Sequence, residues 1–325
     1  MHFALDIKFV SYPTLTPFRI SRNSVNAVRV IQLSIDDDTH IGRGECRPYP
    51  RYNQTPESVM AELESLRPMI EAGDIDSALT ELESCGAARN ALESAWLDFR
   101  TKQSGRTAAD LLEVSTPQAR QTAFTLSWGS VDEMVSAARN AVQYPWLKIK
   151  IGENGLAQVL AVANARPDAK LIIDANEALH EVTLPDFLEA LSGLNIALIE
   201  QPLPAGHKGD LPDTDLIICA DEGLHSQSDL STLWAQGYRA VNVKLDKCGG
   251  PIAARDLILA AKVMGFTVMA GCMVGSSLAM APMVTLESLC DIIDLDGALL
   301  LAKDIEHGLE YQGSLVHPPK ASLWG

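Results

Sequence analysis

Three acidic residues stand at the ends of three successive apolar runs. Asp174 ends "LIID", Glu200 ends "LIE" and Asp221 follows "IICA". If these runs are neighbouring parallel strands of a barrel, their carboxyl ends meet at one face and the three carboxylates converge on one spot. Carboxylates with no His or Cys nearby favour an oxygen-preferring dication, Mg²⁺ first and Mn²⁺ second. Each acid could instead cap the helix after its strand, but separate caps do not explain three in succession.

Lysines mark the ends of two further runs. Lys148 and Lys150 share one face of "WLKIKIG", and Lys244 lies in "VNVKLDK". On an exposed edge strand the first two would only be a solvated face, whereas inside a closed barrel two positive charges are costly and need a reason. We interpret Lys150 as a candidate base, because the charges of Lys148 and the dication disfavour its protonated form. Lys148 is better interpreted as a partner for a substrate carboxylate.

Eight apolar runs, each followed by a polar break and an amphipathic stretch, predict the elements that position these residues. They begin near residue 121 and recur at intervals of roughly twenty residues, the length of a βα unit. Helices are expected at 131–143, 155–165, 227–236 and 250–263. The pattern predicts a (β/α)8 barrel, a modified TIM barrel, over residues 116–303, with strands two and six roughly opposite each other. Residues 203–215, rich in Pro, Gly and Asp, predict a short or missing fourth helix.

The first 115 residues show a different order of elements. Strands are expected near 2–11 and 27–36, and helices near 56–72 and 76–103. This order predicts an N-terminal α+β capping domain over residues 1–115. The tail, about residues 304–325, contains no ninth βα unit, and we expect it to complete the capping domain.

Composition narrows the class of protein. The chain has 325 residues, 47% hydrophobic and 21% charged, as in soluble globular proteins. Its net charge of −16 argues against nucleic acid or an anionic membrane as a partner. No signal peptide or membrane-spanning run is apparent, so we expect a cytoplasmic protein. The six cysteines show no CxxC spacing, which argues against a zinc site or a disulfide framework.

The segments "KIK", "DAN", "EQP", "ADE" and "VKLDKCGG", in this order, resemble the muconate-lactonizing subgroup of the enolase superfamily. The resemblance covers nearly the whole chain. Within the subgroup it is greatest to the dipeptide epimerases, through "GCMVGSSLAMAP" (271–282) and "DLD" (294–296). It implies Mg²⁺-dependent epimerisation of L-Ala-D-Glu to L-Ala-L-Glu by two-base 1,1-proton transfer through an ene-diolate, in the metabolism of murein peptides.

The resemblance also implies roles for single residues. Asp174, Glu200 and Asp221 resemble the metal ligands, Lys150 and Lys244 the two acid/base catalysts, Lys148 the carboxylate partner, Asp294 and Asp296 the pair that binds the ammonium group of a dipeptide, and Arg22 the residue that pairs with the glutamate side chain. Arg19 lies close to Arg22 and is the alternative for the last role. Glu222 is interpreted as a partner of a lysine. Gly275 departs from the larger residue that relatives often carry.

Asp294 and Asp296 are the residues that distinguish between related activities. Period two places both on one face of the eighth strand, and two carboxylates so close repel each other unless a cation lies between them. Alternatively, one acid caps the next helix and the other accepts a hydrogen bond from a backbone amide. An o-succinylbenzoate synthase or a muconate cycloisomerase would share the barrel, acids and lysines without needing this pair.

A third class of function stays open from the residues, namely a metal-binding barrel that acts as a scaffold without catalysis. The sequence retains every chemically required residue, which favours an enzyme. The expected partner is a small dipeptide, with no nucleic acid and no membrane, and a homo-oligomer is compatible with the sequence.

Overall fold

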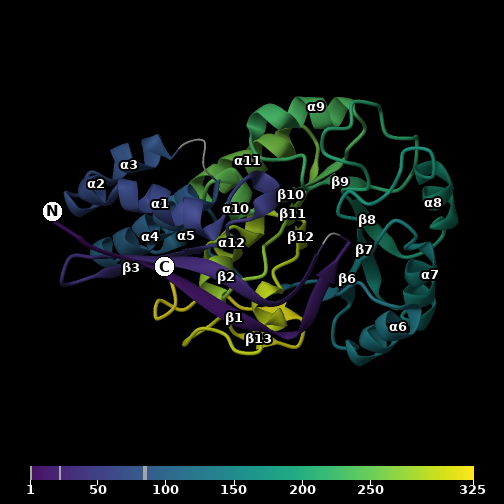
Figure 1. Ribbon diagram of the computed structural model, residues 1–325, viewed down its shortest axis with the longest axis horizontal. Coiled ribbons are helices and arrows are strands. Elements are labelled where there is room, and N and C mark those ends of the chain that lie inside the picture. The colour runs from purple at the N-terminus through teal and green to yellow at the C-terminus, as the bar shows by residue number, and fades with distance from the viewer. Residues whose placement is uncertain (1, 22, 83–85) are drawn as a thin grey trace.

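The computed structural model describes residues 2–21, 23–82 and 86–325. It contains an N-terminal part, built from an antiparallel sheet and helices, beside a large barrel of parallel strands (Figure 1). In the described part of the chain, no helix is both long and apolar enough to cross a membrane.

The eight predicted apolar runs form one parallel sheet, with the strands side by side in chain order. The sheet closes because Ala123 N, before the first strand, donates a hydrogen bond to Ile293 O of the last (2.8 Å). The predicted barrel is therefore confirmed. Its strands are β5 (Phe124–Leu126), β6 (Trp146–Lys150), β7 (Lys170–Asp174), β8 (Ile196–Glu200), β9 (Ile218–Ala220), β10 (Ala240–Val243), β11 (Thr267–Ala270) and β12 (Ile292–Ile293).

Helices surround this sheet. Ser130 begins the first of them with a capping box, in which its hydroxyl accepts from Glu133 N and Glu133 accepts from Ser130 N. The helices are α6 (Val131–Asn140), α7 (Leu156–Ala165), α8 (Leu184–Ala190), α9 (Leu230–Ala235), α10 (Leu245–Cys248), α11 (Pro251–Val263) and α12 (Ser277–Thr285), with 3₁₀ turns η2 (Gln227–Asp229), η3 (Glu287–Leu289) and η4 (Gly297–Leu300). Residues 203–215, all of them described, form no helix between β8 and β9, as predicted.

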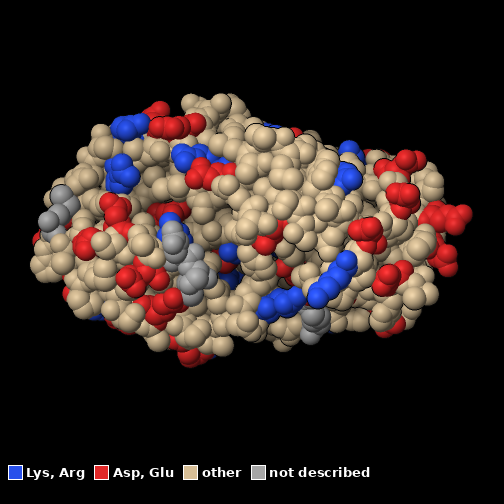
Figure 2. All heavy atoms as spheres, turned by 90° about the horizontal axis from the view of Figure 1, so that it is seen from above, with Lys and Arg blue, Asp and Glu red and all other residues tan. Residues whose placement is uncertain are grey.

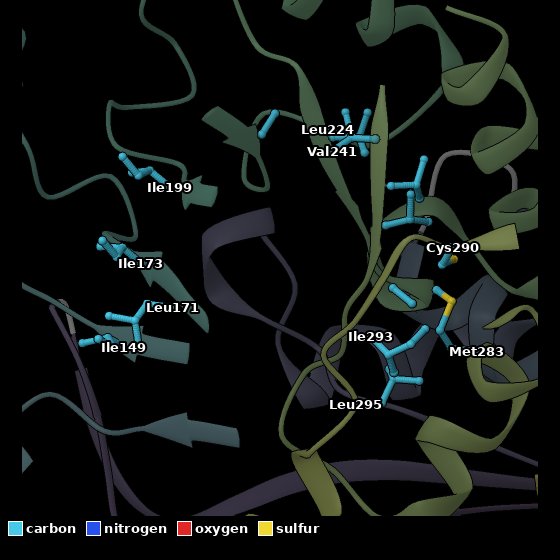
Figure 3. Close-up of a cluster of buried hydrophobic side chains, with 14 of the residues drawn as sticks. Ile149, Leu171, Ile173, Ile199, Leu224, Val241, Met283, Cys290, Ile293 and Leu295 are labelled. Atoms are coloured by element: carbon cyan, nitrogen blue, oxygen red, sulfur yellow. The ribbon is translucent and has the colours of Figure 1, made fainter. Parts of the chain in front are cut away.

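Alternation along the strands separates the packing residues from the polar ones. Ile149, Ile173, Ile199 and Ile293 are at most 3% exposed and belong to the core that joins the barrel to its helices (Figure 3). Their neighbours along each strand point the other way, into the barrel. The packing of each isoleucine against the helices therefore fixes the position of the polar residue next to it, which faces the barrel interior.

The N-terminal part packs a helix closely onto a sheet. In α4 (Gly86–Ser104), alanines face the antiparallel sheet, and a Cβ at Gly44 would lie 2.1 Å from Ala91 O, so only glycine fits there. Strand β3, which carries Gly44, was not predicted from the sequence. The sheet consists of β1 (Ala4–Ile20), β2 (Asn23–Asp36) and β3 (Ile41–Cys46), and the other elements are η1 (Pro50–Tyr52), α1 (Pro56–Ser65), α2 (Arg67–Glu71), α3 (Ile75–Glu81) and α5 (Ala108–Leu112).

The C-terminal tail returns to the N-terminal part. The fully buried indole of Trp324 donates from Nε1 to Ser94 O (3.0 Å), and Gly325 N donates to Asp98 Oδ1 (2.8 Å), both on α4. A small sheet joins β13 (Tyr311–Gln312) and β14 (Leu315–Val316) to β4 (Arg120–Gln121). The division into domains at residues 115 and 303 stays a prediction.

Two buried acids connect the N-terminal part to loops of the barrel. Glu45, at the end of β3, accepts hydrogen bonds from Ser276 N (2.8 Å) and Ser276 Oγ (2.6 Å), just before α12. Asp246, on α10, accepts from Asn90 Nδ2 (2.8 Å) and from Arg47 N (3.2 Å). The segments that follow β10 and β11 are thus fixed from outside the barrel.

Candidate active site

The three predicted acids lie at the carboxyl ends of neighbouring strands. Asp174 ends β7, Glu200 ends β8, and Asp221 directly follows β9. Asp174 and Glu200 are direct partners in the pairing of their strands. All three residues are at most 1% exposed. Such burial is costly for carboxylates unless cations or hydrogen-bond donors surround them.

Lys148 lies among these acids. Its Nζ is 2.7 Å from Glu200 Oε2, 3.1 Å from Asp174 Oδ2 and 2.7 Å from Asp294 Oδ2. The sequence predicted a partner for a substrate carboxylate, but in this structure the ammonium group binds the protein's own acids. A buried ammonium group is stabilised by the nearest opposite charges, and here three are within reach.

Three further lysines bind the outer two of these acids, Asp174 and Asp221. Lys150 Nζ lies 2.5 Å from Asp174 Oδ2, and Lys244 Nζ lies 2.6 Å from Asp221 Oδ2. Lys247, which the sequence analysis did not single out, lies 2.6 Å from Asp221 Oδ1 and also bonds the backbone oxygen of Asp221. Both carboxylate oxygens of Asp221 therefore face an ammonium group.

These ion pairs bear on the prediction that the three carboxylates converge on one spot. Among residues 2–21, 23–82 and 86–325, no three or more His, Cys, Asp or Glu side chains are grouped as a metal site. The three carboxylates instead share ammonium groups, since Lys148 contacts Asp174 and Glu200, and Lys244 lies 2.6 Å from Asp221 and 4.0 Å from Glu200. The donors still suit a hard dication, since they are three buried carboxylates.

Burial raises the pKa values of these acids, whereas the neighbouring lysines lower them. Burial raises the pKa of Glu200 to about 8, and the neighbouring Asp174 adds to the rise. Burial also acts to raise the pKa of Asp174, but Lys150 and Lys148 outweigh it and hold that pKa below its usual range. At Asp221, Lys244 and Lys247 likewise outweigh burial and lower the pKa. Glu200 is thus the least favourably ionised of the three.

The two amines with resolved shifts are held in their charged form. Burial acts to lower the pKa of Lys148, but Asp294 and Glu200 raise it well above its ordinary value. For Lys244, burial is likewise outweighed by Asp221 and Glu200, and the pKa is raised. A change in the charge around these acids would therefore change the basicity of the lysines.

Asp294 and Asp296 follow β12 and have separate partners. Asp294 Oδ2 accepts from Lys148 Nζ (2.7 Å), whereas Asp296 Oδ2 accepts from the backbone amide of Thr125 (2.6 Å). The backbone bond of Asp296 matches one part of the alternative left open by the sequence. Burial and the charge of Asp294 raise the pKa of Asp296 to about 7.

Asn242 is a second residue that the sequence analysis missed. Its Nδ2 donates to Glu200 Oε1 (2.8 Å) inside the barrel. A Cβ at Gly271 would lie 2.0 Å from Asn242 Oδ1, so the glycine makes room for the amide. The signal was available, because Asn242 precedes Lys244 by two positions in "VNVK" and so shares its face of the strand.

A cavity of about 80 Å³ lies where the N-terminal part meets these residues. Acidic side chains spread over both ends of the face in Figure 2, whereas this cavity combines both signs of charge. Its lining is Phe18, Ile20, Asn23, Val25, Arg47, Tyr49, Tyr52, Lys150, Asn176, Asp221, Glu222, Lys244, Cys272, Met273 and Val274. Both candidate bases therefore reach one cavity.

Other predicted residues lie around this cavity or beyond it. Arg22 lies outside the described residues. Arg19 is not in the cavity lining, and its Nη1 lies 3.7 Å from Glu133 Oε1 near the surface. Glu222 lines the cavity and accepts from Asn176 Nδ2 (3.3 Å). Gly275 lies behind the lining, where a Cβ would be 3.1 Å from Glu45 Oε1.

The raised pKa of Asp296 predicts a pH-dependent effect on stability. The folded value is about 7 and the ordinary value is 3.8, so the folded chain binds this proton more tightly and loses stability as the pH rises from about 4 to 7. Asp296→Asn cannot ionise and keeps an oxygen for Thr125 N. In urea unfolding, we expect the variant and the parent to differ little near pH 4 and the variant to be more stable at pH 8, by on the order of 2–4 kcal/mol.

Asp294→Asn is the comparison variant, because it relieves the same repulsion but also removes the negative charge that pairs with Lys148 at 2.7 Å. We expect no gain in stability from this variant at pH 8. If Asp296→Asn gains nothing at pH 8, repulsion within the pair is not significant.

Comparison with known proteins assigns the family. Residues 131–321 match the family model described as "Enolase C-terminal domain-like". The chain is 36% identical over 312 residues to the L-Ala-D/L-Glu epimerase of Escherichia coli (strain K12), covering 94% of this chain and 97% of that protein. It is 38% identical over 302 residues to an N-acetyl-D-glutamate racemase of Pseudoalteromonas sp., covering 91% and 95%.

A solved structure gives the same result over the whole fold. It is an enolase family member from Agrobacterium tumefaciens with homology to dipeptide epimerases, with bound sodium and L-Ala-L-Glu. The TM-score is 0.95 at 39% identity, and the match covers 99% of this chain and 100% of that one. The barrel, the acids at its carboxyl face and these similarities agree: the chain belongs to the enolase superfamily, among relatives that are dipeptide epimerases.

Proposed function

We propose that this protein is an isomerase that interconverts L-Ala-D-Glu and L-Ala-L-Glu by moving one proton at the α-carbon of the glutamate residue. The observation that carries the proposal is the pair Lys150 and Lys244. They stand on β6 and directly after β10, four strands apart in an eight-stranded barrel, and both line one cavity. Two bases facing each other across a substrate suit inversion at one carbon.

In this mechanism one lysine removes the α-proton while the other, in its ammonium form, delivers a proton to the opposite face. The two lysines exchange roles when the reaction runs in reverse. Removal of a proton next to a carboxylate creates a second negative charge, which the nearby ammonium group of Lys148 helps to stabilise. Displacement of water from the cavity by a bound substrate would strengthen these interactions.

A metal ion is part of the proposal, and the relative with bound sodium supports a cation here. We assign it to Asp174, Glu200 and Asp221, whose hard oxygen donors favour Mg²⁺, with Mn²⁺ as a substitute. When bound, it would supply Lewis-acid stabilisation of the substrate carboxylate. The ammonium groups of Lys148, Lys150 and Lys244 that now contact these acids would then be available to the substrate.

The other end of the dipeptide is assigned to Asp294 and Asp296, whose carboxylates would receive its ammonium group. A cytoplasmic location, a role with murein peptides and assembly into homo-oligomers also remain proposals. The acidic surface supports a small-molecule substrate without nucleic acid or membrane as partner (Figure 2).

A second candidate substrate is an N-acylated glutamate. The observation in its favour is that Asp294 already binds Lys148 and Asp296 already binds the Thr125 amide, so neither acid depends on a substrate ammonium group. The relative from Pseudoalteromonas is an N-acetyl-D-glutamate racemase. The chemistry at the α-carbon would be the same, and only the recognition of the substrate's amino end would differ.

Substrate comparison decides between these candidates. Proton exchange at the α-carbon should be followed in D₂O by NMR for L-Ala-L-Glu and for N-acetyl-L-glutamate. We expect kcat/KM to be at least about 30-fold higher for the dipeptide, because a buried ammonium–carboxylate pair is lost with the acetyl compound. The reverse preference would assign the protein as an N-acylglutamate racemase. Exchange into neither compound would contradict both candidates.

Dependence on a dication is the next prediction. Exhaustive chelation should abolish epimerisation and Mg²⁺ should restore it. By calorimetry, Asp174→Asn should weaken Mg²⁺ binding by at least about 10- to 100-fold, because even the loss of groups that support metal ligands costs that much. Asp186→Asn, which removes an exposed acid from α8, is the matched control and should bind Mg²⁺ as the parent does. Full activity in the metal-free protein would disprove the proposed metal role.

The two lysines should each serve one face of the substrate. Lys150→Ala and Lys244→Ala should each lose epimerisation by at least about 10²- to 10⁴-fold, the usual contribution of a general base. Each variant should retain α-proton exchange with solvent for only one stereoisomer, and the two variants should retain opposite ones. Lys208→Ala, on an exposed loop, is the control. Loss of exchange for the same isomer in both variants would place both lysines on one face.

A further inference from the structure

Lys247 is a buried cation at the candidate site that has no role so far. It is 6% exposed, and it is not part of the cavity lining that includes Lys150 and Lys244. It belongs to α10 (Leu245–Cys248), the single helical turn that follows β10. Lys244 and Lys247 are three positions apart along this turn, so their side chains lie on the same side of it. Both therefore reach the same acid, Asp221.

The ammonium group of Lys247 has a full set of hydrogen-bond partners. Its Nζ donates to the backbone oxygen of Asp221, to Asp221 Oδ1 (2.6 Å) and to Asn242 O (3.1 Å). An ammonium group carries three N–H donors, and each of them has an acceptor here. Two of the acceptors are backbone oxygens, which cannot turn away as a side chain can. Lys247 is therefore held more firmly than a lysine bonded to side chains alone.

Lys244 holds the other carboxylate oxygen of Asp221 in a different way. Its Nζ lies 2.6 Å from Asp221 Oδ2 and 4.0 Å from Glu200 Oε1, and both are side-chain oxygens. Because Lys244 also lines the cavity, a cation bound between the acids can take over these contacts. Asp221 thus directs Oδ2 toward Glu200 and the cavity, whereas it directs Oδ1 toward Lys247.

The backbone of Asp221 is fixed as well. Its nitrogen donates to Gln201 Oε1 (2.9 Å), and its backbone oxygen accepts from Lys247. Gln201 is itself held, because its Nε2 donates to the hydroxyl of Tyr238 (3.1 Å). With N, O and Oδ1 all engaged, the Asp221 side chain has little freedom to rotate. The same carboxylate oxygen therefore stays directed at the other acids.

The number of oxygens that Asp221 offers bears on which metal ion suits the site. Ca²⁺ takes about six to eight oxygen ligands and readily accepts both oxygens of one carboxylate. Mg²⁺ is smaller and requires a nearly octahedral arrangement of its ligands. A carboxylate that has one oxygen bonded to Lys247 has only the other to offer. Such a carboxylate suits Mg²⁺ better than Ca²⁺.

We propose that Lys247 is a positioning residue that engages Oδ1 of Asp221, leaves only Oδ2 for a metal ion, and thereby selects Mg²⁺ over Ca²⁺. The inference rests on the proposed function in that Asp174, Glu200 and Asp221 hold the metal ion. It does not depend on whether the substrate is a dipeptide or an N-acylated glutamate.

The ratio of two affinities isolates this role from a simple effect of charge. Loss of the Lys247 charge alone would strengthen the binding of Mg²⁺ and Ca²⁺ alike, because both ions carry the same charge. Loss of the bond to Asp221 Oδ1 would favour Ca²⁺ in particular, because the released oxygen becomes a further ligand. A change in the ratio therefore reports the bond, and a common change in both affinities reports the charge.

The test measures the binding of Mg²⁺ and Ca²⁺ to the full chain by calorimetry after exhaustive chelation. The parent should bind Mg²⁺ more tightly. For Lys247→Met, the ratio of the Kd for Ca²⁺ to the Kd for Mg²⁺ should fall by at least about 10-fold, the usual size of effect when a group that supports a metal ligand is lost. Lys247→Gln removes the charge but keeps a donor for Oδ1, so its ratio should lie closer to that of the parent.

Lys102→Met is the matched control. Lys102 Nζ also donates to a buried acid and to a backbone oxygen, Asp98 Oδ2 (2.8 Å) and Ile41 O (2.8 Å), but it does so within the N-terminal part. Both ions should bind this variant as they bind the parent. Thermal unfolding without metal checks that every variant is folded, and a purely structural role of Lys247 would lower its Tm without changing the ratio.

The outcomes separate this inference from the proposed function. If Lys247→Met changes both affinities by the same factor, Lys247 only balances charge, and the selective role is overturned while the metal site stands. A parent that binds Ca²⁺ as tightly as Mg²⁺ would also overturn it, whatever the variants do. A parent that binds neither ion would instead contradict the metal site of the proposed function.

Discussion

The structure depends on a balance of buried charge at the carboxyl end of the barrel. The single side chain of Lys148 contacts Asp174, Glu200 and Asp294, and Lys148 is only 2% exposed. Removal of Lys148 would leave these buried acids without that ammonium group, and an uncompensated buried charge is among the most destabilising changes in a protein interior. The site is therefore kept together by the same electrostatic attraction that prepares it for chemistry.

The rest of the fold supports this group of charges from two sides. On the outside of the strands, isoleucines such as Ile149, Ile173 and Ile199 fix the backbone against the helices, so the polar neighbours have little freedom to move. On the open side, Glu45 and Asp246 join the N-terminal part to the segments after β11 and β10. Chemistry is thus supported by the barrel, while enclosure comes from the N-terminal part.

Much of this could be predicted from the sequence because strand periodicity and residue type act locally. Asp174, Glu200 and Lys150 end apolar runs, and the order of the runs determined their neighbours in the barrel. Lys247 could not be found in this way, because its contact with Asp221 depends on the single turn of α10. The contacts of Lys148 were also missed, since they depend on how three separate strands place their charges.

The connection made by Glu45 and Asp246 also affects how such a protein could diversify. Because these acids lie at the junction of two structural parts, neither part can be exchanged for a counterpart from a relative unless the matching serines and amides come with it. The lysines that we propose as bases lie wholly in the barrel, whereas Arg47, Tyr49 and Tyr52 line the same cavity from the N-terminal part. Substitutions just after β3 would therefore change the cavity wall without touching the proposed bases.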